Sequence, residues 1–532
     1  MNLRKGRSSA NAWLALGLLA AAALAALVAP DARLRSLMLS TLWLVGPVTA
    51  ISAAIGTPLA ILLYRTDLPG AGALRTVLGV LLLLPLEVHA AAWQAGFGMQ
   101  GWATPDAAPP LIDGWRGAVW IHAAAAVPWV VLIVGLALRL TEPELEEDGL
   151  LDARWGRVFR RVTLRRALGG VVAAALWVAI TTAGDMTVTN IFQVRTLAEE
   201  TYTAFSLGED SFATIRSLLP PLAITVWLII AAMVLVGALA PHRRHETVRA
   251  ARAMRLGRWR WIASLAAATA VLLLAGVPLA SLVYKAGILI TPTGDGWTRS
   301  WSAAKCAAVI AASPARFSRE FGWSLLVGSL AAAVAVVLAA PLAWLARRGG
   351  WRAAPAIVVT AACLAVPGPL VGIALVKLFN QPSLPWLVAL YDRSIAAPLI
   401  AQTIKVLPLA VLVIWHAFNT ISDELVEGAA SEGAGTLKIL LRIVIPERRA
   451  AVALAFLVAL CVALGELSAS ILVVPPGVSL LSVQIFGLIH YGVDDYVAGV
   501  CLVLIGSVAL LTGIAAMLAR RTTREALALS EH

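Results

Sequence analysis

Four charged side chains lie in long apolar stretches of this sequence, where a charge is costly unless it is paired or functional. Asp185 and Glu466 each follow a glycine, and Glu87 and Lys405 fall in two other apolar runs. Carboxylate oxygens are ligands that hard cations prefer, so the acids could line a route for such a cation. Pairing between helices, for instance of Lys405 with Glu466 or Glu87, is the other interpretation, and the sequence leaves both open.

The stretches that hold these charges belong to a chain of 532 residues that is 60% hydrophobic. Apolar runs of about 18 or more residues are typical of helices that cross a membrane. The sequence therefore predicts an all-α membrane protein with about 12 transmembrane helices. The predicted spans are residues 12–29, 40–64, 73–95, 117–138, 167–184, 219–240, 260–284, 322–345, 353–376, 395–418, 450–473 and 496–519.

The net charge of +12 is distributed unevenly along the chain. If the N-terminus lies inside the cell, most of the 42 Lys and Arg residues fall in loops on that same side, with dense groups in 154–166 and 243–260. An excess of Lys and Arg marks cytoplasmic loops. We therefore expect both termini in the cytoplasm, and we interpret the basic charge as a sign of topology rather than of nucleic-acid binding.

The two halves of the chain match each other at offsets of 280 to 283 residues. So small a drift over so long a stretch indicates a duplication, and six spans per half make the two repeats parallel. We predict a first repeat over 1–240, a cytoplasmic linker over 241–259 and a second repeat over 260–532. The matched pairs are Pro58 and Pro341, Pro85 and Pro367, Pro128 and Pro408, Glu147 and Glu427, and Asp185 and Glu466.

A polar segment before the span at 450–473 carries the signals of two short helices. Ser422 or Asp423 can cap the first helix, Gly433 and Gly435 permit a turn, and Thr436 can cap the second. The second helix shows an apolar stripe at helical spacing, which predicts a single apolar face. The stripe is Leu437, Leu440, Leu441 and Val444, and the first half offers Trp155, Val158, Phe159 and Val162.

This segment resembles the EAA loop of ABC importer permeases, whose pattern is E-A-A-x3-G-x9-I-x-L-P. Gly428 replaces the first alanine of the pattern, and Ile445 replaces its leucine. The equivalent loop of the first half is degenerate and one residue shorter, with Glu147 in place, Ala153 where the glycine stands and Arg165 where the proline stands. The matching residues of the second half are Glu427, Ala429, Gly433, Ile443 and Pro446.

The resemblance implies that the loop docks into a separate ATPase. Residues 464–495 are similar to the fused, two-repeat permeases of iron(III) importers, with thiamine and 2-aminoethylphosphonate permeases as close relatives. The resemblance also implies a multi-pass subunit of the bacterial inner membrane, joined by two ATPase subunits and by a periplasmic or lipid-tethered binding protein. Among possible cargoes, the resemblance favours iron(III).

The chain shows no pattern of an enzyme or of a bound cofactor. A P-loop needs Gly before its Lys, and Gly-Lys does not occur in these residues, so we expect ATP to be used by a partner subunit. The four cysteines form no CxxC motif and no metal-ligand spacing, and the seven histidines are scattered. We therefore predict a transport subunit without catalytic residues and without a metal site.

A secondary transporter of the major-facilitator type is the main alternative, because it also has twelve spans in parallel halves. Its loop between spans two and three carries a charged Gly-Asp-Arg pattern, which residues 64–75 match only weakly. That class also leaves the EAA spacings unexplained. A membrane enzyme would need a convergent catalytic set, and a structural scaffold would show no movement linked to nucleotide.

Overall fold

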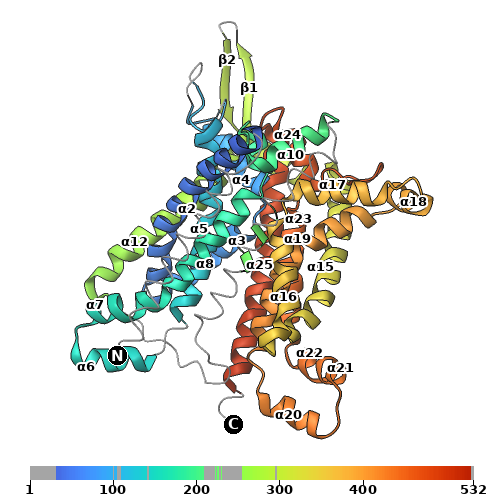
Figure 1. Cartoon of the computed structure of the whole chain (residues 1–532). Helices are drawn as coiled ribbons and strands as arrows, with labels where there is room; N and C mark the ends of the chain where they lie inside the picture. The colour runs from blue at the N-terminus through green and yellow to red at the C-terminus, as the bar shows by residue number, and fades with distance from the viewer. Residues whose placement is uncertain are drawn as a thin grey trace. The chain divides into compact units, whose positions relative to one another are not determined.

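The apolar runs of the sequence form long helices in the computed structural model (Figure 1). The structure describes residues 32–99, 101–104, 109–139, 143–208, 254–293 and 296–528, and five residues between 222 and 230. Among the described residues, seven helices are long and apolar enough to cross a membrane, or up to nine if each of two bent helix pairs counts as one span. The chain is thus a largely helical membrane protein.

Seven predicted spans are confirmed as helices of this kind, and three others differ from the prediction. The predicted spans 73–95 and 353–376 are each broken in two, and the span predicted at 450–473 is a shorter apolar helix, Arg449–Leu464. The span predicted at 12–29, most of the span predicted at 219–240 and most of the linker at 241–259 lie outside the described residues.

Two compact units make up the chain, and they do not follow the boundaries of the predicted repeats. Unit 1 consists of 1–82, 115–184 and 194–274. Its elements are α2 (Ala32–Arg65), α3 (Ala71–Leu83), α5 (Gly114–Arg139), α6 (Pro143–Asp152), α7 (Trp155–Val158), the π-helix η1 (Phe159–Thr163), α8 (Leu164–Ala183), α10 (Leu197–Ser206), the 3-10 helix η2 (Gly257–Trp259) and α12 (Arg260–Val271).

Unit 2 consists of 83–114, 185–193 and 275–532, so two short segments of the first half belong to it. Those segments supply α4 (Leu86–Phe97) and α9 (Thr187–Ile191). The π-helix η3 (Leu272–Gly276) leads into the unit. The other elements are α13 (Val277–Gly287), β1 (Ile288–Thr293), β2 (Gly296–Trp301), α14 (Ala303–Arg316), α15 (Ser318–Arg347), the 3-10 helix η4 (Gly350–Ala353), α16 (Ala354–Ala365), α17 (Gly368–Phe379), α18 (Pro385–Arg393), α19 (Ala396–Phe418), α20 (Asp423–Ser431), α21 (Thr436–Ile439), the π-helix η5 (Leu440–Val444), α22 (Ile445–Glu447), α23 (Arg449–Leu464), α24 (Leu481–Ile489) and α25 (Asp495–Ala528).

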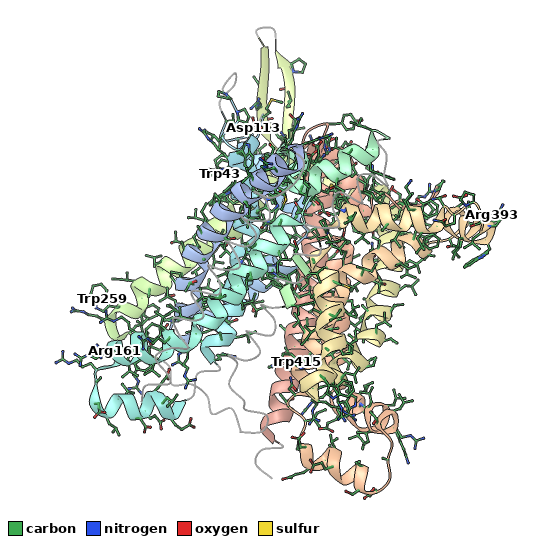
Figure 2. All side chains as sticks on the ribbon, in the orientation of Figure 1. Trp43, Asp113, Arg161, Trp259, Arg393 and Trp415 are labelled. Atoms are coloured by element: carbon green, nitrogen blue, oxygen red, sulfur yellow. The ribbon has the colours of Figure 1, made fainter. Side chains whose placement is uncertain are left out.

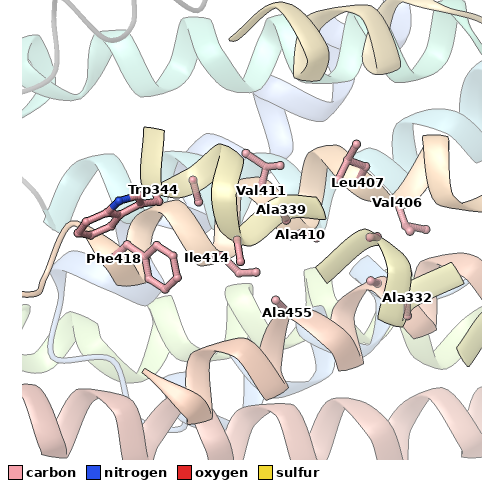
Figure 3. Close-up of a cluster of buried hydrophobic side chains, with 14 of the residues drawn as sticks. Ala332, Ala339, Trp344, Val406, Leu407, Ala410, Val411, Ile414, Phe418 and Ala455 are labelled. Atoms are coloured by element: carbon pink, nitrogen blue, oxygen red, sulfur yellow. The ribbon is translucent and has the colours of Figure 1, made fainter. Parts of the chain in front are cut away.

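Small side chains allow the central helices of unit 2 to pack closely. Ala332, Ala335, Ala339 and Ala343 recur every three or four residues along α15 and are fully buried. They face α19 and α23 in a core that also holds Ile414 (Figure 3). Helices in a membrane gain stability from van der Waals packing, and small residues bring the backbones near enough for it.

Prolines break the two bent helix pairs. Pro367 separates α16 from α17, which turn by 101° from one another, and Pro85 separates α3 from α4. A proline inside a helix removes one hydrogen bond and clashes with the preceding turn. Pro58, Pro341, Pro128 and Pro408 lie inside continuous helices, so proline alone does not decide where a span breaks.

Large apolar side chains cover the outside of the long helices. Trp43 on α2 is 74% exposed and Trp259 before α12 is 58% exposed, and both point away from unit 1 (Figure 2). Unit 2 also carries an antiparallel hairpin, in which Ile288 of β1 pairs with Trp301 of β2. This hairpin and α24 lie at one end of unit 2, and α20 to α22 lie at the other (Figure 1).

Candidate coupling loops and the buried acid cluster

The predicted polar segment folds as two short helices, α20 and α21, that we call the α20–α21 hairpin. Ser422 caps α20, because its hydroxyl accepts a hydrogen bond from the Leu425 amide at 3.3 Å. Asp423 and Glu424 occupy the first turn, where negative charge stabilises a helix. Thr436 does not cap α21: Gly435 holds the cap position, and the Thr436 hydroxyl instead accepts a hydrogen bond from Arg348.

Gly433 makes the turn of the hairpin. Its φ of +84° is left-handed, a conformation that glycine adopts without a steric penalty. The Gly433 amide donates to the Ala430 carbonyl, and the Ala434 amide donates to the Ala429 carbonyl, both at 3.0 Å. These bonds satisfy carbonyls that the end of α20 would otherwise leave open. The next helix can therefore turn back at once.

The apolar stripe predicted as one face is divided between the core and the surface. Leu440 and Val444 are buried in the core of unit 2, whereas Leu437 is 68% exposed and Leu441 is 54% exposed. The prediction of a single face was wrong because η5 is a π-helix, whose extra residue per turn changes the side-chain phase. Leu425 on α20 is also exposed.

The residues that match the EAA pattern differ in their exposure to solvent. Glu427 and Gly428 are exposed on α20, and a Cβ atom added at Gly428 would meet no other atom within 4 Å. Pro446 is exposed in α22, and Ala429 and Ile443 are half-buried. The hairpin thus offers a partner three exposed leucines, an acid and the open space beside a glycine.

Arg347 attaches the hairpin to the core, a role that sequence analysis missed. Its guanidinium donates to the Phe418 carbonyl at 2.9 Å, to the Ile421 carbonyl at 2.8 Å and to the Asp423 carboxylate at 2.7 Å. The planar fork of arginine suits several acceptors at once. The sequence does hold a signal for this role. Arg65 precedes Arg347 by 282 residues, an offset within the range of the other matched pairs.

Arg65 holds the equivalent loop in unit 1. Its side chain is fully buried and forms an ion pair with Glu146, whose carboxylate also accepts a hydrogen bond from the Thr163 hydroxyl at 2.5 Å. The order α6, α7, η1 repeats the order α20, α21, η5. Glu147 is exposed like Glu427, but Ala153 has no left-handed backbone, so the shorter turn is built without the glycine conformation.

Asp185 and Glu466 have the same local role in two short turns that follow long helices. The Asp185 carboxylate accepts a hydrogen bond from the Val188 amide at 2.9 Å, and that of Glu466 accepts one from the Ala469 amide at 2.8 Å. Each acid thus reaches the amide three residues ahead. Both turns belong to unit 2. The turns meet, since the Thr187 and Ser468 hydroxyls lie 3.3 Å apart.

Glu87 joins these acids from the first turn of α4. The residue is 1% exposed, and its Oε1 atom has no hydrogen-bond partner among the described residues. The turn that holds Glu466 contacts the start of α4, because a Cβ atom added at Gly465 would lie 2.6 Å from the Pro85 ring. The structure therefore gathers three of the four predicted charges. Within the described part of the chain, no group of three or more His, Cys, Asp or Glu residues could hold a metal ion.

Lys405 is the fourth charge, and it does not form the ion pair that the sequence left open. Its ammonium group donates to the Val366 carbonyl at 3.0 Å. This carbonyl lies at the end of α16, just before Pro367 breaks the helix, so Lys405 stabilises a broken helix end.

Two neighbouring acids at the start of α25 have structural roles. Asp494 accepts a hydrogen bond from the Val497 amide at 2.7 Å and caps α25. Asp495 forms an ion pair with Lys305 at 2.7 Å, which ties α14 to α25. Cys306 is buried where α14 packs against α13 and α25.

Residues 324–524 match the family described as the binding-protein-dependent transport system inner membrane component. The match decides the class of this segment. It covers α16 to α24, most of α15 and nearly all of α25, and it includes both the α20–α21 hairpin and Glu466. Together with the apolar helices, it supports an importer permease of the ABC type in a membrane. No curated protein matches the chain.

Proposed function

We propose that this chain is the permease subunit of an ATP-driven, binding-protein-dependent importer. The single observation that carries the proposal is the α20–α21 hairpin inside the matched segment. It is capped, turned by a left-handed glycine and attached by Arg347, and it still exposes Leu425, Leu437 and Leu441. Exposed leucines on a rigid support are typical of a surface that a partner covers.

The partner of the hairpin is a separate ATPase, and two copies serve the two loops. The recurrence of the α6, α7, η1 order supports two parallel repeats that share one pathway, with both termini on the ATPase side. A binding protein, free in the periplasm or tethered to lipid, delivers cargo at the other side of the bacterial inner membrane. The chain itself binds no cofactor and hydrolyses no ATP.

Iron(III) is the cargo that we propose, with thiamine and 2-aminoethylphosphonate as alternatives. Glu87, Asp185 and Glu466 support a cationic cargo, because they lie in segments that contact one another and carboxylates that line a membrane pathway favour cations. They lie at the far end of α23 from the α20–α21 hairpin, and this helix of 16 residues is about 24 Å long. The acids thus stand near the side where cargo enters.

Co-purification with candidate ATPases tests the proposal. Leu437→Asp should abolish association and ATP-dependent uptake, because Leu437 is exposed and contributes nothing to the core. Leu207→Asp is the matched control: Leu207 is 76% exposed at the end of α10, far along the chain from either loop. If Leu437→Asp retains the ATPase as the control does, the hairpin does not couple, and dependence on an ion gradient should be tested next.

A further inference from the structure

The connection between α15 and α16 is strongly basic. Residues 345–358 contain three arginines and no acid. Arg347 is buried and holds the α20–α21 hairpin, whereas Arg348 and Arg352 are exposed. Among the described residues, Arg352 forms no hydrogen bond or ion pair, and Arg348 forms one hydrogen bond, to the Thr436 hydroxyl at 3.2 Å. Most N–H donors of the two exposed guanidinium groups are therefore available to a ligand.

Aromatic rings orient both exposed arginines. The Arg348 guanidinium lies over the Trp344 ring at 5.6 Å from its centre, and that of Arg352 lies over the Trp351 ring at 5.8 Å. The charge of an arginine is attracted to the face of such a ring. Stacking leaves the N–H groups at the edge of the guanidinium accessible, and their planar fork matches the oxygens of a phosphate group. The two side chains are therefore suited to a phosphate.

Exposed apolar side chains lie on the two helices that this connection joins. Val337 on α15 is 70% exposed, Val358 on α16 is also exposed, and the two helices contact each other. Trp351, between the helices in sequence, is 81% exposed. Tryptophan is enriched where a membrane helix meets the headgroup layer, and the apolar surface beyond it faces lipid tails. A ligand with an anionic head and apolar tails therefore fits this region better than a free phosphate ion does.

We propose that Arg348 and Arg352 bind the headgroup phosphate of an anionic phospholipid, whose tails lie along the exposed apolar side chains of α15 and α16. Anionic lipids attract basic residues at the ends of membrane helices. Arg348 also contacts Thr436, the first residue of α21, so the headgroup lies at the base of the α20–α21 hairpin. The inference needs only the membrane helices, and it holds whether or not the chain binds an ATPase.

Photolabelling of the full chain tests this lipid site. The probe is phosphatidylglycerol that carries a diazirine in one tail, and phosphatidylcholine with the same tail is the neutral comparison. The detergent-solubilised chain is illuminated with each probe well below saturation, so that labelling follows affinity, and mass spectrometry locates the labelled residues. The internal standard is the labelling of Leu325 and Leu326, which are exposed toward the other end of α15.

We expect phosphatidylglycerol to label the segments around Val337 and Val358 more strongly than phosphatidylcholine does. Arg348→Gln and Arg352→Gln should each lower this labelling about fivefold, and the double variant about 25-fold, because each basic residue near an anionic surface changes affinity by roughly that factor. Lysine at both positions keeps the charge and should retain most of the labelling. Arg393→Gln, at an exposed arginine of α18, is the matched control and should change nothing.

Equal labelling of these segments by the two lipids overturns the proposal, because the apolar surface alone would then bind them. This comparison uses the unmodified chain, so it decides the question even if a variant misfolds. Labelling by phosphatidylglycerol that survives the double glutamine change overturns the proposal too. If that variant keeps its labelling and instead loses a partner ATPase, the two arginines contact the ATPase and not a lipid. Size-exclusion elution checks that each variant is folded.

Discussion

Gly428 offers the sharpest test of the α20–α21 hairpin, because a side chain there meets nothing within this chain. It lies inside α20 and is exposed, with no atom within 4 Å of an added Cβ. Replacing a helical glycine by alanine gains about 1 kcal/mol of helix stability. Gly428→Ala should therefore stabilise α20 and preserve coupling, and Gly428→Trp should leave the fold intact.

An ATPase that covers α20 would meet the tryptophan directly. Overpacking a well-fitted contact costs about 1–3 kcal/mol. At about 1.4 kcal/mol per factor of ten, the ATPase should bind Gly428→Trp roughly 5- to 150-fold more weakly. The assay is the dissociation constant of the purified ATPase for the detergent-solubilised chain, with size-exclusion elution as the check on folding.

Gly322→Trp is the matched control for this experiment. Gly322 is also an exposed glycine inside a long helix, α15, and an added Cβ there meets no atom within 4 Å. We expect the control to bind the ATPase like the unmodified chain. If Gly428→Trp binds equally well, α20 is not covered by the ATPase and the docking argument is refuted.

Three further predictions concern single residues. Gly433→Asn should keep the left-handed turn better than Gly433→Ala, which should lower coupling because a non-glycine residue there costs about 1–2 kcal/mol; equal ATPase stimulation by both variants would count against the turn. Arg65→Met should lower the free energy of unfolding by about 3–5 kcal/mol, because Glu146 is left buried without its partner. Arg393→Met, a change at an exposed arginine, is the control. Equal melting temperatures of the two variants would contradict the prediction. Lys405→Met should loosen the break at Pro367 and slow uptake without loss of ATPase binding, and uptake at the normal rate would exclude that role.

Much of the architecture is predictable from the sequence, because the signals are local. A run of apolar residues must form a helix in a membrane, since every backbone polar group there needs an internal partner. Seven of the predicted spans are such helices. Ser422 and Gly433 likewise act within a few residues of their own position, as cap and as turn.

What the sequence analysis missed depends on neighbours that are remote along the chain. The apolar stripe of the second loop helix is divided by a π-helix, whose phase is set by packing on the core. The sequence offers two candidate acids for Lys405, yet its partner is the carbonyl of Val366 at a broken helix end.

The amino-acid sequence by itself determined the apolar helices and the polar loop between them, and it predicts that positions about 281 residues apart are equivalent. Only the tertiary structure decided that Arg347 attaches that loop, that Glu87 joins the two equivalent acids, and that Thr187 meets Ser468. The physical reason is how far apart along the chain the contacting residues lie. Helix formation follows from contacts a few residues apart, whereas the Thr187–Ser468 contact joins residues far apart along the chain and exists only after the chain has folded.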